Sequence, residues 1–196
     1  MAQPAPTLLA VPEYLAIERS SSVKHELFRG QMLAMAGASL EHNVIVANIV
    51  AELRAALRDR PCVALPSDMK VLVRASGHYY YPDATVVCGA AEFADEERDA
   101  IVNPTVVVEV LSDSTERRDR GAKFHDYRTI ASCTDYLMCS SAEPFVEHYT
   151  RDADGWRLRE YAAGEVIELR GIETKLAMTE IYAKVFANDE ATSSSA

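Results

Sequence analysis

The sequence predicts an α+β fold in which helices pack on a mixed β-sheet. Short runs of β-branched residues are interspersed irregularly with segments of helical periodicity, which is typical of this fold class. The chain has 196 residues, 48% of them hydrophobic, with 8 glycines and 8 prolines. A chain of this length buries roughly 70% of its unfolded surface, which is enough for one core. This composition excludes a disordered or fibrous chain.

Helices and strands alternate along the whole chain. Helices are predicted at Val11 to Glu18, between Ser39 and Pro61, at about Glu116 to Ile130, and at Met178 to Phe186. Strands are predicted at 69–74, from Tyr79 onward, and at 84–88, 105–111, 136–139 and 166–169, with hairpins over 24–35 and 145–161. The hairpins turn at Gly30 and at 152–155. These antiparallel hairpins are additions to the predicted sheet.

We expect one domain over residues 11–187, between an N-terminal tail of residues 1–10 and a flexible C-terminal tail of residues 188–196. No run of eighteen apolar residues is present, so a membrane span is not expected. The first residues lack the basic segment of a secretory signal. The chain is therefore expected to be a cytoplasmic protein without a membrane partner.

The four cysteines are Cys62, Cys88, Cys133 and Cys139. They form no CxxC pair and, together with histidines, no zinc-binding spacing. In a cytoplasmic chain we expect reduced, partly buried thiols.

The charge pattern limits how the protein can bind nucleic acid. With 20 Lys and Arg against 30 Asp and Glu, the net charge is −10. This charge argues against a surface that coats nucleic acid indiscriminately, because such binding uses many contacts between cations and phosphates. A local basic groove remains compatible with the sequence, because five cations lie within twelve residues: Arg117, Arg118, Arg120, Lys123 and Arg128.

Glu109 interrupts an otherwise apolar strand, and Asp83 directly precedes a neighbouring one. A buried carboxylate must pair, take up a proton or bind a cation. Two carboxylates at the ends of adjacent strands can converge on one divalent ion, an arrangement that suits Mg²⁺. The alternative is structural, with Glu109 paired to an Arg or Lys and Asp83 capping a turn.

Asp119, Lys123 and Tyr127 follow at positions i, i+4 and i+8 of the predicted helix, so they share one face. Lys123 could orient an attacking water or stabilise charge on a phosphate. The alternative is an exposed Asp119–Lys123 pair with Tyr127 partly buried.

Taken together, these residues resemble the Uma family of putative restriction endonucleases, a branch of the PD-(D/E)XK nuclease superfamily. The resemblance rests on the segments Tyr81-Pro82-Asp83, Val108 to Ser112, Asp119 to Lys123 with Tyr127, His25 to Gly30, and Ser39 to His42. It extends from about Glu26 to about Tyr149. It implies a restriction-endonuclease-like sheet core flanked by helices.

The resemblance also implies a Mg²⁺- or Mn²⁺-dependent endonuclease that hydrolyses DNA phosphodiester bonds with a metal-activated water. Asp83, Glu109 and the Val110 backbone carbonyl would be the metal ligands. The superfamily lysine normally lies two residues after the glutamate, where this chain has Leu111. In the Uma branch this role moves to the following helix, here Lys123, so the catalytic set would be Asp83, Glu109 and Lys123.

Four further residues are accessory candidates: Glu26, His42, Asp119 and Tyr127. Glu26 and His42 could supply an additional metal ligand or an acid–base group. A homodimer is expected, because two-fold symmetry would match a duplex.

Two alternatives remain open on the sequence. The first is a catalytically inactive homodimer of the same fold that binds nucleic acid or protein. The net charge favours it, as does the segment Asp135 to Ser141, which departs from the family pattern Glu-Tyr-Trp-Leu-Val-Asp-Pro. The second is a metal-free glycan hydrolase with Asp83 and Glu109 flanking a cleft.

Overall fold

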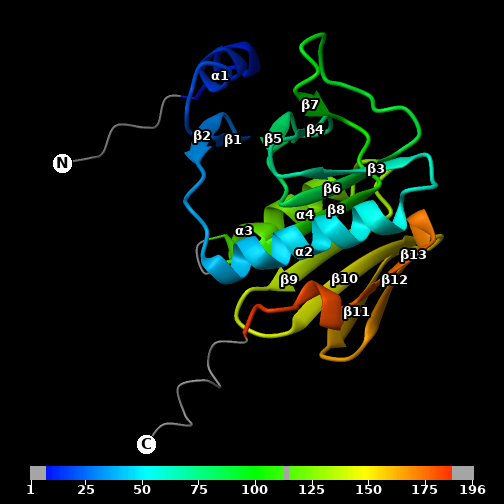
Figure 1. Ribbon diagram of the computed structural model, residues 1–196. Helices are drawn as coiled ribbons and strands as arrows, with labels where there is room; N and C mark the ends of the chain where they lie inside the picture. The colour runs from blue at the N-terminus through cyan, green and yellow to red at the C-terminus, as the bar shows by residue number, and fades with distance from the viewer. Residues whose placement is uncertain (1–7, 113–114, 187–196) are drawn as a thin grey trace, which may run out of the picture.

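The structure, a computed structural model, describes residues 8–112 and 115–186. Of the predicted tails, residues 1–7 and 188–196 lie outside the described residues, as do the predicted helix-capping residues Asp113 and Ser114. Two sheets and a separate hairpin are arranged around one long helix, α2 (Figure 1). The predicted α+β class with a mixed sheet is confirmed.

The larger sheet has six strands in the order β11-β10-β9-β8-β6-β3. Their bounds are β3 Cys62–Pro66, β6 Ala84–Cys88, β8 Val106–Leu111, β9 Asp135–Ser140, β10 Phe145–Asp152 and β11 Gly155–Ala162. Strands β8 and β9 pair in parallel and the other neighbours pair antiparallel, so the sheet is mixed. The predicted hairpin over 145–161 is confirmed, whereas β3 was not predicted.

The smaller sheet has five strands in the order β2-β1-β5-β4-β7. Their bounds are β1 His25–Phe28, β2 Gln31–Ala34, β4 Lys70–Val73, β5 His78–Tyr80 and β7 Ala100–Ile101. The β1–β2 turn has positive φ at both central residues, Arg29 and Gly30, which suits a tight hairpin. Helix α1 (Val11–Glu18) forms as predicted and lies at this end of the molecule (Figure 1). The remaining strands, β12 (Val166–Leu169) and β13 (Thr174–Ala177), form a hairpin of their own.

The two faces of β8 are packed against different parts of the molecule. Val106, Val108 and Val110 belong to the core cluster that includes the apolar stripe of α2 (Leu40–Ala56). Val107 and Leu111 belong to a second cluster on the opposite face. Because side chains alternate along a strand, Glu109 shares the face of Val107 and Leu111.

The segment predicted as one helix over 116–130 is divided, so that prediction is wrong in detail. It consists of α3 (Glu116–Arg118), a π-helical turn, η1 (Asp119–Lys123), and α4 (Phe124–Tyr127). The backbone N–H of Phe124 donates to the Asp119 carbonyl, and the Tyr136 hydroxyl donates to the same oxygen at 3.0 Å. A side chain that competes for a helical carbonyl disturbs the regular α-helical ladder.

The C-terminal helix is shorter than predicted. Helix α5 spans Met178–Ile181, and the left-handed backbone of Lys184, with φ of 62°, prevents its regular continuation. The Tyr182 hydroxyl instead lies 2.9 Å from the Ser140 carbonyl oxygen and 2.7 Å from the Phe145 carbonyl oxygen, and it shares its one proton between them. No helix within the described residues is long and apolar enough to cross a membrane.

The prediction that all four cysteines are reduced is wrong for two of them. Cys62 and Cys88 lie directly opposite each other on β3 and β6 and form a disulfide. Cys133 and Cys139 are free and buried. Sequence spacing could not indicate the bond, because it depends on the pairing register of β3, a strand that the sequence pattern did not predict.

Candidate active site

The pairing of β6 with β8 brings Asp83 to the strand that carries Glu109. Ala84 lies opposite Val108, so Asp83, one residue before β6, lies beside Glu109 and Val110. The Asp83 Oδ2 atom accepts a hydrogen bond from the Val110 backbone N–H at 2.7 Å. Asp83 and Glu109 are therefore neighbours on adjacent strands, and the convergence of their carboxylates on one metal ion stays a prediction.

The ammonium group of Lys123 lies among three carboxylates from separate elements. Its Nζ atom is 3.0 Å from Glu26 Oε1, 3.0 Å from Glu109 Oε1 and 3.1 Å from Asp119 Oδ1. Glu26 comes from β1, Glu109 from β8, and Asp119 and Lys123 from η1. We call these four residues the buried charge cluster, because all four are buried.

Tyr127 and Tyr80 enclose the buried charge cluster. The Tyr127 hydroxyl donates to Glu109 Oε1 at 3.2 Å, and Lys123 Nζ lies 5.7 Å from the centre of the Tyr80 ring. Both tyrosines are fully buried. Glu109 is therefore held by both Lys123 and Tyr127, which fixes its orientation.

His42 orients Asp83 from the other side. It lies in the first turn of α2, where its backbone N–H donates to the capping side chain of Ser39. Its Nε2 atom is 3.1 Å from Asp83 Oδ1. Its buried Nδ1 atom has no hydrogen-bond partner among the described residues. The side chains predicted from the sequence thus lie on neighbouring elements, and their catalytic and metal-binding roles stay predictions.

Arg118 is a member of the site that was not among the predicted site residues. Its terminal nitrogen is 2.6 Å from Glu26 Oε2, although its buried Nε atom has no hydrogen-bond partner within the described residues. In the sequence, Arg118 was distinguished only by lying in the basic segment 117–128, and Arg117 and Arg120 lie in the same segment. The distinction depends on the fold, which places Arg118 at the end of α3 beside Glu26, whereas Arg120 pairs with Glu116 and Glu147.

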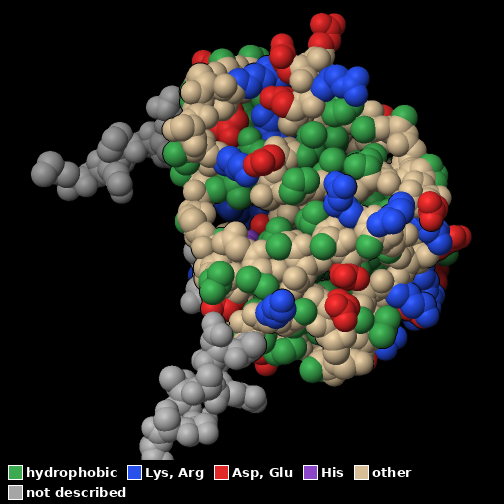
Figure 2. Space-filling model, viewed as in Figure 1, with side chains coloured by type: hydrophobic (Ala, Val, Ile, Leu, Met, Phe, Trp, Pro, Cys, Tyr) green, Lys and Arg blue, Asp and Glu red, His purple; other side chains and the backbone are tan. Residues whose placement is uncertain are grey.

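The accessible side of the site is formed by Asp83, His42 and Arg118. Their side chains are 13%, 15% and 27% exposed, compared with 4% for both Glu109 and Lys123. A small hollow in which basic, acidic and histidine side chains are visible lies between the β1–β2 region and α2 (Figure 2). A ligand would therefore meet these three residues first and the buried charge cluster behind them.

Carboxyl groups outnumber cationic side chains at the site. Burial raises the pKa of Glu109 well above its usual value, and the carboxylates of Asp119, Asp83 and Glu26 raise it further, against the opposing effect of Lys123. Burial alone would lower the pKa of Lys123, but Glu109, Glu26 and Asp119 together hold it well above its usual value. Lys123 is therefore charged, and it does not compensate all of the surrounding carboxylates.

The donor chemistry fits a divalent cation. Four carboxylates, from Glu26, Asp83, Glu109 and Asp119, face two permanent cations, Lys123 and Arg118. Two buried oxygens, Glu26 Oε2 and Asp119 Oδ1, lie near cations but have no aligned hydrogen bond in the described part of the chain. An additional positive charge would offset this excess, and carboxylate oxygens are the ligands that Mg²⁺ prefers.

The arrangement is not a preformed metal cage. Among residues 8–112 and 115–186, no three His, Cys, Asp or Glu side chains are grouped as metal ligands. The Lys123 ammonium lies between three of the carboxylates, so Glu109 Oε1 is already paired. The Val110 backbone N–H donates to Asp83, and the metal-ligand role expected for the Val110 carbonyl stays a prediction.

Three sequence alternatives can be compared with this geometry. The suggestion of an exposed Asp119–Lys123 pair is wrong, because both side chains are buried. Pairing of Glu109 with a lysine does occur, and it coexists with the excess of carboxylates. A glycan hydrolase needs two carboxyl groups that flank an open cleft, which disagrees with the burial of Glu109.

The fold is a restriction-endonuclease-like α+β fold. The fold is similar to a crystal structure of a "putative nuclease belonging to DUF820" from Anabaena variabilis, with a TM-score of 0.72 over 92% of this chain and 99% of that one. At 15% sequence identity, this similarity concerns the fold alone.

Residues 11–179 match the Uma2 family, described as "Putative restriction endonuclease", and the chain belongs to that family. It is 34% identical over 162 residues to the uncharacterized protein sll1609 of Synechocystis sp., covering 83% of this chain and 92% of that protein. It is 35% identical over 175 residues to the uncharacterized protein slr1290 of the same organism, covering 89% and 91%. The resemblance inferred from the sequence motifs is confirmed.

Proposed function

We propose that the protein is a Mg²⁺- or Mn²⁺-dependent endonuclease that hydrolyses phosphodiester bonds in DNA. The observation that carries this proposal is the excess of carboxylates around Lys123, beside Asp83 and at the end of a central strand. Membership of a family described as "Putative restriction endonuclease" supports the same reaction class. A structural ion-pair cluster would favour balanced charge, because each uncompensated buried carboxylate costs stability.

In this proposal, Asp83, Glu109 and the Val110 carbonyl would hold the metal ion. A bound ion would lower the pKa of a coordinated water and would offset negative charge on the scissile phosphate. Asp83 is already oriented toward such a site by the Val110 N–H at 2.7 Å and by His42 at 3.1 Å. Glu109 is oriented by the Tyr127 hydroxyl.

Lys123 would position the attacking water and stabilise the negative charge that develops on the phosphate. Glu26 and Asp119 serve this role by keeping the ammonium protonated and fixed in place. Arg118 is the most exposed cation of the site, and its guanidinium suits a phosphate oxygen of the substrate. No covalent intermediate with the protein is needed.

The test is an endonuclease assay with substrates that do not require a known target sequence. Random-sequence pools of double-stranded DNA, single-stranded DNA and RNA would be incubated with Mg²⁺, Mn²⁺ or EDTA. We expect DNA cleavage with either metal, no cleavage with EDTA, and a loss of about 100-fold or more in Glu109→Gln. Glu96→Gln is the matched control, because Glu96 is exposed and remote from the site.

Equal cleavage by the parent and Glu109→Gln would contradict the proposed site. Absence of cleavage from every pool, combined with undiminished DNA binding, would favour the catalytically inactive homodimer. The homodimer itself stays a prediction, which sedimentation at working concentrations would test. The expected cytoplasmic location also stays a prediction.

A further inference from the structure

A second polar site lies on the face of the six-stranded sheet opposite the buried charge cluster. In the register of β9, β10 and β11, Asp135 pairs with Thr150, and Thr150 pairs with Arg157. Paired residues point to the same face of a sheet. Leu137 lies two residues after Asp135 on β9, so it shares the face of Asp135, and it packs in the core cluster that includes the apolar side chains of α2. The site is therefore separated from Glu109 by the thickness of the sheet.

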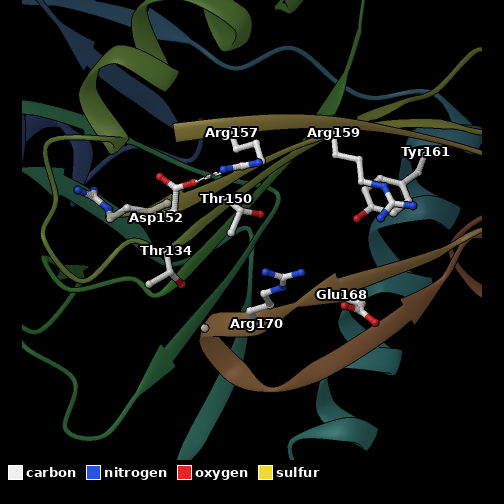
Figure 3. Close-up of a pocket in the computed structure, with 10 residues that line it drawn as sticks. Thr134, Thr150, Asp152, Arg157, Arg159, Tyr161, Glu168 and Arg170 are labelled. Carbon is white, nitrogen blue, oxygen red and sulfur yellow. Dashed lines mark hydrogen bonds and ion pairs between the residues drawn. The ribbon is translucent and has the colours of Figure 1, made fainter. Parts of the chain in front are cut away.

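The site is a pocket of about 620 Å³ between the β10–β11 hairpin and the β12–η2 segment (Figure 3). One wall is β11, which presents Arg157, Arg159 and Tyr161 at alternating positions to the same face. The other wall carries Glu168 from β12 and Arg170 from η2, the 3₁₀ turn Arg170–Ile172. A volume of this order fits a ligand the size of a nucleotide.

Gly171 sets how closely the second wall approaches the sheet. A Cβ atom at this position would lie 2.0 Å from Thr134 Oγ1 and 2.9 Å from Asp135 Oδ2, so only glycine fits without a shift. This close contact holds Arg170 across the pocket from β11, as Figure 3 shows. The Thr134 and Thr150 hydroxyls also line the pocket.

The arginines of the pocket differ in how firmly they are held. Arg151 is structural, because it donates to the carbonyls of Cys133, Arg128 and Ile130 at 2.7–2.8 Å. By contrast, the Arg170 backbone carbonyl accepts from the Glu173 N–H, but the Arg170 guanidinium has no hydrogen bond or ion pair within the described residues.

Arg157 and Arg159 pair with exposed acidic side chains, and the Arg159 guanidinium also lies 4.5 Å from the centre of the Tyr161 ring. Arg157 pairs with Asp152 at 3.0 Å and Arg159 with Glu165 at 3.5 Å, and both arginine side chains are mostly exposed. Exposed pairs of this kind contribute little to stability, so exchanging one for a ligand costs little. Three guanidinium groups can therefore turn toward a bound anion.

We infer that this pocket binds a small phosphate-bearing ligand, of the size of a mononucleotide. The guanidinium fork matches the oxygens of a phosphate group, and hydroxyls complete such sites. Asp152 and Glu168 at the pocket and the net charge of −10 disfavour a long polyanion in the same place. The ligand is therefore a compact phosphate monoester and not a DNA strand, and the inference does not depend on nuclease activity.

The experiment is calorimetric titration of the full chain with inorganic phosphate and with AMP, in EDTA. We expect AMP to bind the parent, and Arg170→Ala to bind it about tenfold more weakly or worse, as loss of a charge-assisted hydrogen bond implies. Glu168→Gln should bind more tightly, because it removes a repelling charge. Arg74→Ala is the matched control, since Arg74 is exposed and outside the pocket.

The comparison of probes separates the possible sources of the phosphate. A higher affinity for AMP than for inorganic phosphate would show that the pocket also accepts the nucleoside. Equal affinity would show that the pocket recognises only the phosphate group. Either result supports the inference. Absence of binding of both, or equal binding by the parent and Arg170→Ala, would overturn it. A single-stranded oligonucleotide that binds through Arg170 when AMP does not would also overturn it.

Discussion

The two faces of β8 show opposite ways of packing the same strand. One face, with Val106, Val108 and Val110, packs against α2 with aliphatic groups alone. The other places Glu109 among the tyrosines and the charges of η1. Aliphatic burial stabilises a fold in proportion to area, whereas buried charge stabilises it little or not at all. The difference indicates that the first face maintains the fold and that the second is retained for another purpose.

The face of β8 that carries Glu109 is called the charged face below. Removing its ammonium group, that of Lys123, should have the largest effect on stability. Lys123→Ala leaves Glu26, Glu109 and Asp119 buried near one another without their shared ammonium group. We expect the free energy of unfolding at pH 7 to fall by about 3–5 kcal/mol. Chemical denaturation measures this change, and a loss below about 1 kcal/mol would show that the carboxylates are compensated by other means.

Removing the disulfide should have the next largest effect on stability. Cys62 and Cys88 pack at the edge of the core cluster on the aliphatic face of β8. The bond closes a loop with a sequence separation of 26 residues, so the double variant Cys62→Ser/Cys88→Ser should lose about 2–4 kcal/mol. The parent under reducing conditions should show a similar loss in thermal melts. If the melting temperature of the parent is the same with and without a reductant, the disulfide is absent.

A smaller loss is expected within the aliphatic face itself. Val108→Ala removes two buried methyl groups beside α2 and should cost about 2 kcal/mol in unfolding free energy. It should leave nuclease activity unchanged, because its side chain points away from the charged face. Reduced activity in a fully folded Val108→Ala protein would show that the two faces are coupled.

The smallest effect on stability is expected for Glu109→Gln, although it should abolish activity. Because the folded-state pKa of Glu109 is raised, the parent loses stability as pH increases above the usual value of 4.5. The glutamine variant lacks this loss, so its unfolding free energy should equal or exceed that of the parent, most clearly at high pH. Denaturation curves at several pH values measure the trend, and a variant that becomes less stable relative to the parent as pH rises would refute it.

How much of this could be read from the sequence depends on how local each signal is. Glu109 was recognisable because a carboxylate interrupts an apolar strand, and Asp83 because it precedes a neighbouring strand. Lys123 was located by the family resemblance and by its helical spacing from Asp119. The fold class followed from the hydrophobic periods, which depend on each segment alone.

The features that sequence reasoning missed depend on contacts between distant segments. The π-helical turn involves Tyr136, which lies seventeen positions beyond Asp119. The disulfide depends on the β3–β6 register, and the arginine pocket depends on the approach of Gly171 to Thr134. No local pattern around any of these residues specifies its partner.

The most direct test of the central claim is calorimetric titration of the protein with Mn²⁺. The parent, Asp83→Asn and the matched control Asp59→Asn would be compared, since Asp59 is exposed and remote from the site. If the charged face is a divalent cation site, the parent and the control bind roughly one ion per chain and Asp83→Asn loses that binding. Equal binding by all three proteins, or none by the parent, would contradict the account.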